Sequence, residues 1–373
     1  MSIYHWLVIS ILLLALLLHG NRKGNTLFIV LVFVLLFGIQ GLRDCKTIGN
    51  DSRTSYRYEF NKMAETEWNE LGDVRDWLGG SSEDDVRGRD RSFGHRWLMK
   101  IVYEASGGDY QWFIVVVAVI IIVSEAVFIH RFSPSPIQSV LYYMGLLFFS
   151  FQMSATKQSL AMSVLLFAFP AIIDRKPLLF ILLVVFASFF HLPALVFLPA
   201  YWIANMKLAR NYLILLVIAF GLTYLLRGRV VSLLSDAYYE SEVEAISGMR
   251  FLANKVIIML MIILAALLIR PPHSEDRVYC ALLQLMGIAA VLQTFAGYSN
   301  VFERLADYYF QLSVIFIPMV FERTKLKRRY LTMNSLEMIY SYVPVMFCAF
   351  SIWRFLDCIT NDVHFTPFRF FFQ

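Results

Sequence analysis

The sequence predicts an all-α membrane protein whose chain crosses the bilayer many times. Hydrophobic residues make up 58% of the 373 residues, and the mean hydropathy is +0.61. Apolar runs recur along the whole chain, and the short loops between them carry much of the Lys and Arg. That placement of charge is typical of topology signals rather than of nucleic-acid binding. We therefore expect one integral membrane domain over residues 1–373 and no nucleic-acid partner.

The predicted spans follow from the rule that a spanning helix needs about 20 mostly apolar residues. The first run is followed by Arg22 and Lys23 rather than by a small-residue cleavage site, so we expect it to be retained as a span. In chain order the candidate runs are residues 3–18, 26–39, 112–129, 137–153, 160–173, 178–204, 212–226, 254–269, 278–295, 305–321 and 336–356.

The long run at 178–204 decides the topology. Basic residues in short loops favour the cytoplasm, and Arg22 and Lys23 place the first loop there. A single span at 178–204 would put the basic cluster at 323–329 outside. Two short antiparallel helices turning at His191 return that cluster to the cytoplasm. We therefore predict a re-entrant-like pair around His191, about 12 transmembrane helices, and both termini outside.

Two loops are expected on the outer face, at residues 43–111 and 227–253. In the first, Phe93, Trp97 and Ile101 recur at helical spacing with Lys100 opposite, which predicts a helix lying in the membrane interface. The second carries aromatic and acidic side chains together, a mixture that suits sugar rings and hydroxyls. Its Tyr238 and Tyr239 would serve equally to anchor the loop at the interface.

The segment 41–60, GLRDCKTIGNDSRTSYRYEF, is the most unusual polar stretch. Arg43 stands at the membrane edge with a fork-shaped, permanent charge that suits a phosphate. Gly49 permits a turn that would aim Asp51 and Tyr56 back at it. The alternative is an ordinary helix end with a snorkelling arginine, followed by a surface loop.

The predicted topology brings five basic residues to the outer membrane level. Cations at that edge run against the positive-inside trend and call for a partner, such as a diphosphate. The alternative is that they pair with carboxylates such as Asp44, Asp51, Glu303 or Asp307 in structural bridges. The five residues are Arg43, Lys157, His191, Arg250 and Arg304.

Several motifs are missing from the sequence. It has no Gly-rich phosphate loop, HExxH, GxSxG or CxxC, which argues against a nucleotide-driven pump and against metal hydrolysis. We expect no cofactor and no metal. The four cysteines have no zinc-type spacing, and whether Cys45 and Cys358 pair is left open.

Four separated motifs resemble the EpsG family, which are Wzy-type polysaccharide (O-antigen) polymerases of bacterial envelopes. They are the segment 41–60, the step KQSLA at 157–161, the run ASFFHLPA at 187–194, and Arg304 ahead of the aromatic residues 308–310. The likeness extends from about residue 37 to about residue 318. The family usually has Arg at the position of Lys157, so this chain keeps the charge there but loses the bidentate geometry.

The resemblance implies a bundle of GT-C type in the bacterial cytoplasmic (inner) membrane, with its site on the outer face. Its activity would join glycan units linked to undecaprenyl diphosphate into O-antigen, capsule or exopolysaccharide. Membrane lipid and a chain-length regulator protein are the further partners it implies. The sugars, the linkage, its stereochemistry and the oligomeric state are not predicted.

Roles for the site residues follow from the resemblance together with their chemistry. His191 is the first choice for the base that deprotonates the acceptor hydroxyl, because histidine titrates near neutral pH, and Asp51 is the second. The alternative for His191 is a residue that only caps the turn before Pro193. The expected diphosphate ligands are Arg43, Lys157, Arg250 and Arg304, and the expected glycan ligands are Tyr56, Gln158, Tyr238 and Tyr239.

Two other functions stay open. A transporter or flippase of the same lipid-linked oligosaccharide would also place cations in a polytopic bundle, although at several depths. A membrane acyltransferase that uses His191 as base ranks last, because no acid accompanies the histidine at helical spacing.

Overall fold

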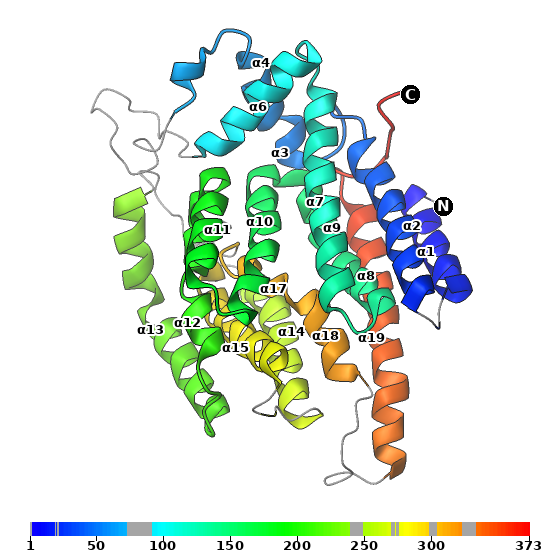
Figure 1. Cartoon of the computed structure of the whole chain (residues 1–373), viewed down its shortest axis with the longest axis vertical. Helices are drawn as coiled ribbons and strands as arrows, with labels where there is room; N and C mark the ends of the chain where they lie inside the picture. Colours follow the sequence, from blue (N-terminus) through cyan, green and yellow to red (C-terminus); the bar gives the residue numbers. More distant parts are fainter. Residues whose placement is uncertain are drawn as a thin grey trace.

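The computed structural model describes residues 2–18, 20, 22–72, 92–238, 249–269, 273, 276–297, 304–322 and 333–373. Within these residues the chain is helical, and its β-type pairing is limited to an isolated antiparallel bridge between Arg43 and Phe370. Most long helices run along the long axis of the molecule (Figure 1). The all-α class predicted from the sequence is confirmed.

The first helices are apolar on all sides, as lipid-facing segments must be. Helix α1 (Ile3–Leu18) packs beside α2 (Arg22–Gly41), and α2 packs against α7 (Tyr110–Phe132). The Asp109 carboxylate caps α7 by accepting from the Gln111 backbone N–H at 2.9 Å. His130 and Arg131 in its last turn suit the negative helix end.

The predicted span at 137–153 is wrong as one helix, because the structure divides it. Helix α8 (Pro136–Gly145) ends two residues before Leu147, whose φ of 69° is left-handed, and α9 (Phe148–Ser154) follows. The freed Gly145 carbonyl accepts from Arg354 of α19 (Met333–Asn361) at 2.7 Å. A Cβ at Gly145 would overlap Ser351, so the close approach of α8 and α19 requires glycine here.

The run at 178–204 turns at His191. Helix α11 (Pro177–Phe190) ends there, and η2 (Leu192–Phe197) and α12 (Ala200–Asn205) lead away. The ring of Phe180 lies 6.1 Å from that of Phe197 and 5.5 Å from that of Tyr201, so the two arms lie side by side. Pro193 in the first turn of η2 is compatible with a helix start.

The second half of the chain completes the bundle around α10 (Thr156–Ile173). The predicted span at 305–321 is also divided, into α17 and α18. The remaining elements are α13 (Tyr212–Tyr238), α14 (Met249–Leu268), α15 (Arg277–Leu292), η3 (Gln293–Gly297), α17 (Asp307–Phe310) and α18 (Ser313–Phe321).

Six segments of the described chain are long and apolar enough to cross a membrane. Four shorter apolar helices accompany them. Length and composition therefore support a polytopic membrane protein, and the expected count of about 12 crossings is not reached by these helices alone. The six are residues 22–41, 110–132, 156–173, 212–229, 277–296 and 342–361.

One end of the bundle is covered by α3 (Asn50–Arg53), α4 (Ser55–Lys62), η1 (Trp68–Glu70) and α6 (Phe93–Ser106), which we call the cap (Figure 1). The helix predicted around Phe93 is present as α6, and its place in the membrane interface stays a prediction. Trp97 and Ile101 are exposed, whereas Lys100 is buried and donates to the Met63 carbonyl at 2.9 Å. A backbone acceptor in the cap satisfies this lysine, which hydrophobic periodicity alone does not reveal.

A C-terminal segment, residues 362–373, fastens the cap side of the bundle, and we call it the strap. The Gly49 N–H donates to the His364 carbonyl at 2.9 Å, and the Asp44 N–H donates to the Arg369 carbonyl at 2.9 Å. The Tyr4 hydroxyl donates to the Phe365 carbonyl at 3.0 Å. The strap therefore ties α1 and the end of α2 to the far end of the described chain.

Candidate functional site

Residues 304–310, which we call the hub, collect side chains from three other parts of the bundle. The hub comprises a turn at 304–306 and the short helix α17. The Gln158 side-chain amide on α10 donates to the Arg304 carbonyl at 3.0 Å. Tyr308 contacts the turn at His191, and Asp307 contacts α14. The hub therefore brings the first turn of α10, the His191 turn and α14 to one place.

Lys157 links this place to the cap. Its ammonium group lies 3.2 Å from a carboxylate oxygen of Glu59 and 5.2 Å from the ring centre of Tyr56, and both partners are on α4. The Tyr56 ring lies 5.1 Å from that of His95 on α6. The His95 Nε2 is 3.2 Å from the Thr156 hydroxyl at the start of α10. Tyr56 and Lys157, which the sequence analysis assigned to separate roles, are therefore neighbours.

His191 is half-buried, and its Nδ1 is hydrogen-bonded to the hydroxyl of the buried Tyr308. This bond orients the ring and couples its tautomer to the direction of the Tyr308 hydroxyl. If Nδ1 carries the hydrogen and donates it to the tyrosine oxygen, Nε2 holds the lone pair and is a base. The His191 carbonyl also accepts from the Ala194 N–H at 3.0 Å, so the backbone contributes to the turn.

Arg304 is half-buried and lies over an aromatic face. Its guanidinium carbon is 5.7 Å from the ring centre of Phe151 on α9. Such a contact holds the planar guanidinium against an apolar surface while its N–H groups stay available for oxygen ligands.

Lys255 on α14 is a cation of this site that sequence analysis missed. Its ammonium group lies 3.1 Å and 3.3 Å from the two carboxylate oxygens of Asp307. Asp307 was considered only in the alternative reading, as a structural partner for one of the five basic residues, and its partner here is a different cation. Glu59 was missed as well, although its spacing of three residues from Tyr56 puts both on one helical face.

Arg43 lies elsewhere, inside the junction between α2 and α9. It is 2% exposed, and its guanidinium donates to the Gln40 carbonyl and, at 2.7 Å, to the Met153 carbonyl. Burial lowers the pKa of Arg43 to about 10, so the group is charged at neutral pH. Both bonds hold the Arg43 guanidinium against backbone carbonyls, and neither joins it to a hub residue.

The other predicted residues are placed as follows. Asp51 is half-buried in α3, beside Ser52, whose hydroxyl donates to the Met153 carbonyl at 3.1 Å. Tyr238 ends α13 and Arg250 lies in the first turn of α14, but their side chains lie outside the described residues, as does all of Tyr239. The described cysteines, including Cys45 and Cys358, are free thiols.

Three cations, two carboxylates and a histidine–tyrosine pair thus lie in the hub or in the segments joined to it. The cations are Lys157, Lys255 and Arg304, the carboxylates are those of Glu59 and Asp307, and the pair is His191 with Tyr308. Lys157 and Lys255 each have a carboxylate partner, so each positive charge is compensated locally. Cations held this way can bind anionic oxygens, and the oriented imidazole can accept a proton. Among the described residues, no group of three His, Cys, Asp or Glu side chains is arranged to hold a metal ion.

Comparison with known proteins identifies the family of the chain. No curated protein and no solved structure matches the chain. The model of the EpsG family, whose members are polysaccharide polymerases of Wzy-like type, matches residues 5–370, nearly the whole chain. The chain therefore belongs to the EpsG family.

Proposed function

We propose that this protein joins glycan units carried on undecaprenyl diphosphate into a surface polysaccharide, at the outer face of a bacterial cytoplasmic membrane. Membership of the EpsG family supports a membrane polymerase acting on lipid-linked glycans. The observation that carries the finer proposal is that the hub, which contains Arg304, contacts Gln158, the neighbour of Lys157, and is bonded through Tyr308 to His191, so three segments far apart in sequence meet. O-antigen, capsule and exopolysaccharide are all compatible products.

The reaction forms one glycosidic bond and breaks one sugar–phosphate bond. The acceptor hydroxyl oxygen attacks the anomeric carbon of the donor, the diphosphate lipid departs with the bonding electrons, and the hydroxyl proton passes to a base. The developing charge on the diphosphate needs compensation, which pre-positioned cations provide. Lys157 and Arg304 are the proposed ligands, and Arg250 is proposed with them on sequence grounds.

His191 is the proposed base, acting at Nε2 while Nδ1 donates to the Tyr308 hydroxyl. Asp51 stays the second choice. Tyr56 and Gln158 are proposed to contact the glycan, because each neighbours a proposed diphosphate ligand. We propose Arg43 as a positioning residue rather than a phosphate ligand, since backbone carbonyls occupy its fork.

The experiment is a gel of surface polysaccharide from a deletion strain complemented with variants. Wild type should restore a ladder, and the deletion should leave single repeat units. His191→Ala should abolish the ladder, and Tyr308→Phe should weaken it by about tenfold or more, because the imidazole loses the partner that orients it. Tyr309→Phe is the matched control, since that hydroxyl donates to the Val196 carbonyl at 2.7 Å instead.

Two outcomes would overturn the proposal. Normal chain lengths with His191→Ala and with Lys157→Ala would remove these side chains from the chemistry. Accumulation of lipid-linked units on the cytoplasmic face of the deletion strain would mean that the protein moves its substrate, as a flippase does, rather than joining it. Protein amount in the membrane is measured for every variant.

A further inference from the structure

The cap contains a cavity that the proposed reaction does not use. It has a volume of about 600 Å³ and lies between the stretch 64–69 and α6. A cavity of this size matches a ligand of two or three sugar rings, since small-molecule sites measure roughly 300–1,000 Å³. We call it the cap pocket; its lining residues are Ala64, Glu65, Thr66, Glu67, Trp68, Asn69 and Lys100.

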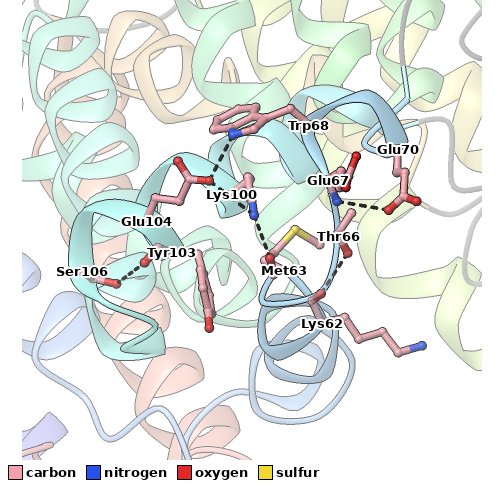
Figure 2. A network of polar contacts seen from close by, with 10 residues as sticks. All are labelled: Lys62, Met63, Thr66, Glu67, Trp68, Glu70, Lys100, Tyr103, Glu104 and Ser106. Atoms are coloured by element: carbon pink, nitrogen blue, oxygen red, sulfur yellow. Dashed lines mark hydrogen bonds and ion pairs between the residues drawn. The ribbon is translucent and has the colours of Figure 1, made fainter.

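Trp68 gives the cap pocket an aromatic wall that is held in place. Its side chain is 39% exposed and lines the pocket. The indole N–H donates to the Glu104 carboxylate at 3.0 Å, and the ring meets the Trp97 ring edge-on at 5.4 Å between centres. Figure 2 shows the Trp68 indole beside Lys100 and Glu104. A fixed aromatic surface offers a sugar ring a stacking partner at small entropic cost.

Lys100 forms the buried part of the lining. It is 8% exposed, donates to the Met63 carbonyl at 2.9 Å, and lies 3.3 Å from the Glu104 carboxylate. An ammonium group has three donors, and these two partners account for two of them. A buried charged donor at the wall of a polar cavity suits a ligand oxygen such as a hydroxyl.

The charge of the lining restricts the ligand. Glu65, Glu67 and Asn69 are exposed at the pocket and offer acceptors and an amide, which pair with vicinal hydroxyls. The Lys100 charge is already compensated by Glu104, so the two glutamates leave the lining acidic. An acidic lining with an aromatic wall favours an uncharged saccharide over one that carries carboxylates.

We infer that the cap pocket binds a short uncharged saccharide segment, separate from the hub and on the same covered end of the bundle. The inference rests on the proposed function for the source of this saccharide, which would be the acceptor or the growing polymer. Binding itself needs neither a diphosphate nor the reaction. The two proposals can therefore fail separately.

The test uses the full-length protein in lipid nanodiscs and two probes. The neutral probe is an oligosaccharide released by mild acid from the strain's own surface polysaccharide, with any acidic sugars reduced to neutral ones. The anionic probe is the same fragment without reduction. Where the polymer is itself neutral, an oligogalacturonate replaces it. Calorimetric titration should give saturable binding of the neutral probe, and about tenfold weaker binding with Trp68→Ala or Asn69→Ala. Trp202→Ala is the control, because Trp202 of α12 is 52% exposed and neither lines the pocket nor contacts Trp68.

Three results would overturn the inference. They are no saturable binding by wild type, equal binding by wild type and Asn69→Ala, and tighter binding of the anionic probe. Asn69 is exposed, so its substitution leaves the fold in place even if Trp68→Ala does not. Retained saccharide binding with a failed polymerase test would leave the cap pocket standing and remove only the hub proposal.

Discussion

Lys157 is the residue at which cap and bundle meet. Its ammonium group has a carboxylate from Glu59 on one side and the face of Tyr56 on the other. A diphosphate arriving at Lys157 would exchange with the Glu59 carboxylate, because both are oxygen anions that one compact ammonium can bind. The pair thus holds the cation in position between reactions.

We predict that Lys157→Ala lowers the rate of glycan transfer by about 100-fold, the usual loss when one pre-positioned donor to a developing charge is removed. Lys157→Arg should retain most activity, and Glu59→Gln should act mainly on substrate binding. Transfer by purified protein, compared as kcat and KM, makes the measurement. Lys62→Ala is the control, since Lys62 is exposed on α4, the helix that carries Glu59. Equal losses at Lys62 and Lys157 would contradict a specific role.

Arg43 presents the opposite case, a buried charge whose partners are backbone carbonyls. Arg43→Met should lower the amount of folded protein, because it removes the side-chain donor of the Gln40 carbonyl and one of the two side-chain donors of the Met153 carbonyl, at a cost of about 1–3 kcal/mol. Polymer made per molecule of folded protein should stay close to wild type. Quantitative blotting alongside the polysaccharide gel checks this. Full protein levels with loss of polymer would restore Arg43 as a phosphate ligand.

At the scale of elements, the turn at Gly49 decides how the segment 41–60 sits on the bundle. Its φ is +89°, and a Cβ there would overlap the Ser52 hydroxyl and lie 2.7 Å from the Met153 carbonyl oxygen. Gly49 also donates to the strap at His364. No L side chain fits this position without movement of α3 or α9.

We predict that Gly49→Ala destabilises the protein by about 1–3 kcal/mol, from the strained φ and the overlap together. Thermal unfolding in detergent should show a lower midpoint for this variant. Gly38→Ala is the matched control, because a Cβ at Gly38 in α2 meets nothing within 4 Å. An unchanged midpoint for Gly49→Ala would contradict the packing described for the turn.

Some elements were predictable from the sequence and others were not. Hydropathy located the helices and the turn at His191, because proline and a polar residue interrupt an apolar run there. It did not reveal the break at Leu147, since that break is stabilised by Arg354, more than 200 residues away. Nor did it reveal that Lys100 of α6 is buried, because a carbonyl of another segment satisfies this lysine.

For the whole molecule, the candidate site shows the same limit. The sequence pointed to Gln158, His191 and Arg304, which hydrogen bonds of the hub connect, and to Lys157, whose side chain contacts the cap instead. The sequence could not separate Arg43 from these residues, because it shows that a side chain is charged but not whether backbone carbonyls or a ligand will bind it. Lys255 was not identified, because it stands alone in the apolar run 254–269 and a single basic residue there matches no motif.

Orientation in the membrane gives a prediction at this scale. If the cap faces outward, cysteine introduced at exposed Glu65 in a cysteine-free background should react with a membrane-impermeant maleimide in intact cells. Cysteine at exposed Lys207, near the opposite end, should react only after lysis. Both positions lie in the described chain. The positive-inside rule predicts that the cap faces outward and that Lys207 faces the cytoplasm. The reverse pattern would put the hub chemistry on the cytoplasmic side.

The strap has a consequence for biogenesis. The end of α2 leaves the ribosome early, but its pairing partner at Phe370 follows about 330 residues later. At about 5–20 residues per second, that interval is roughly 16–65 s. Through this time Arg43 and the turn at Gly49 lack their strap contacts. The first long polar segment to be synthesised is thus among the last to be completed, and assembly factors at the membrane would meet it in an unfinished state.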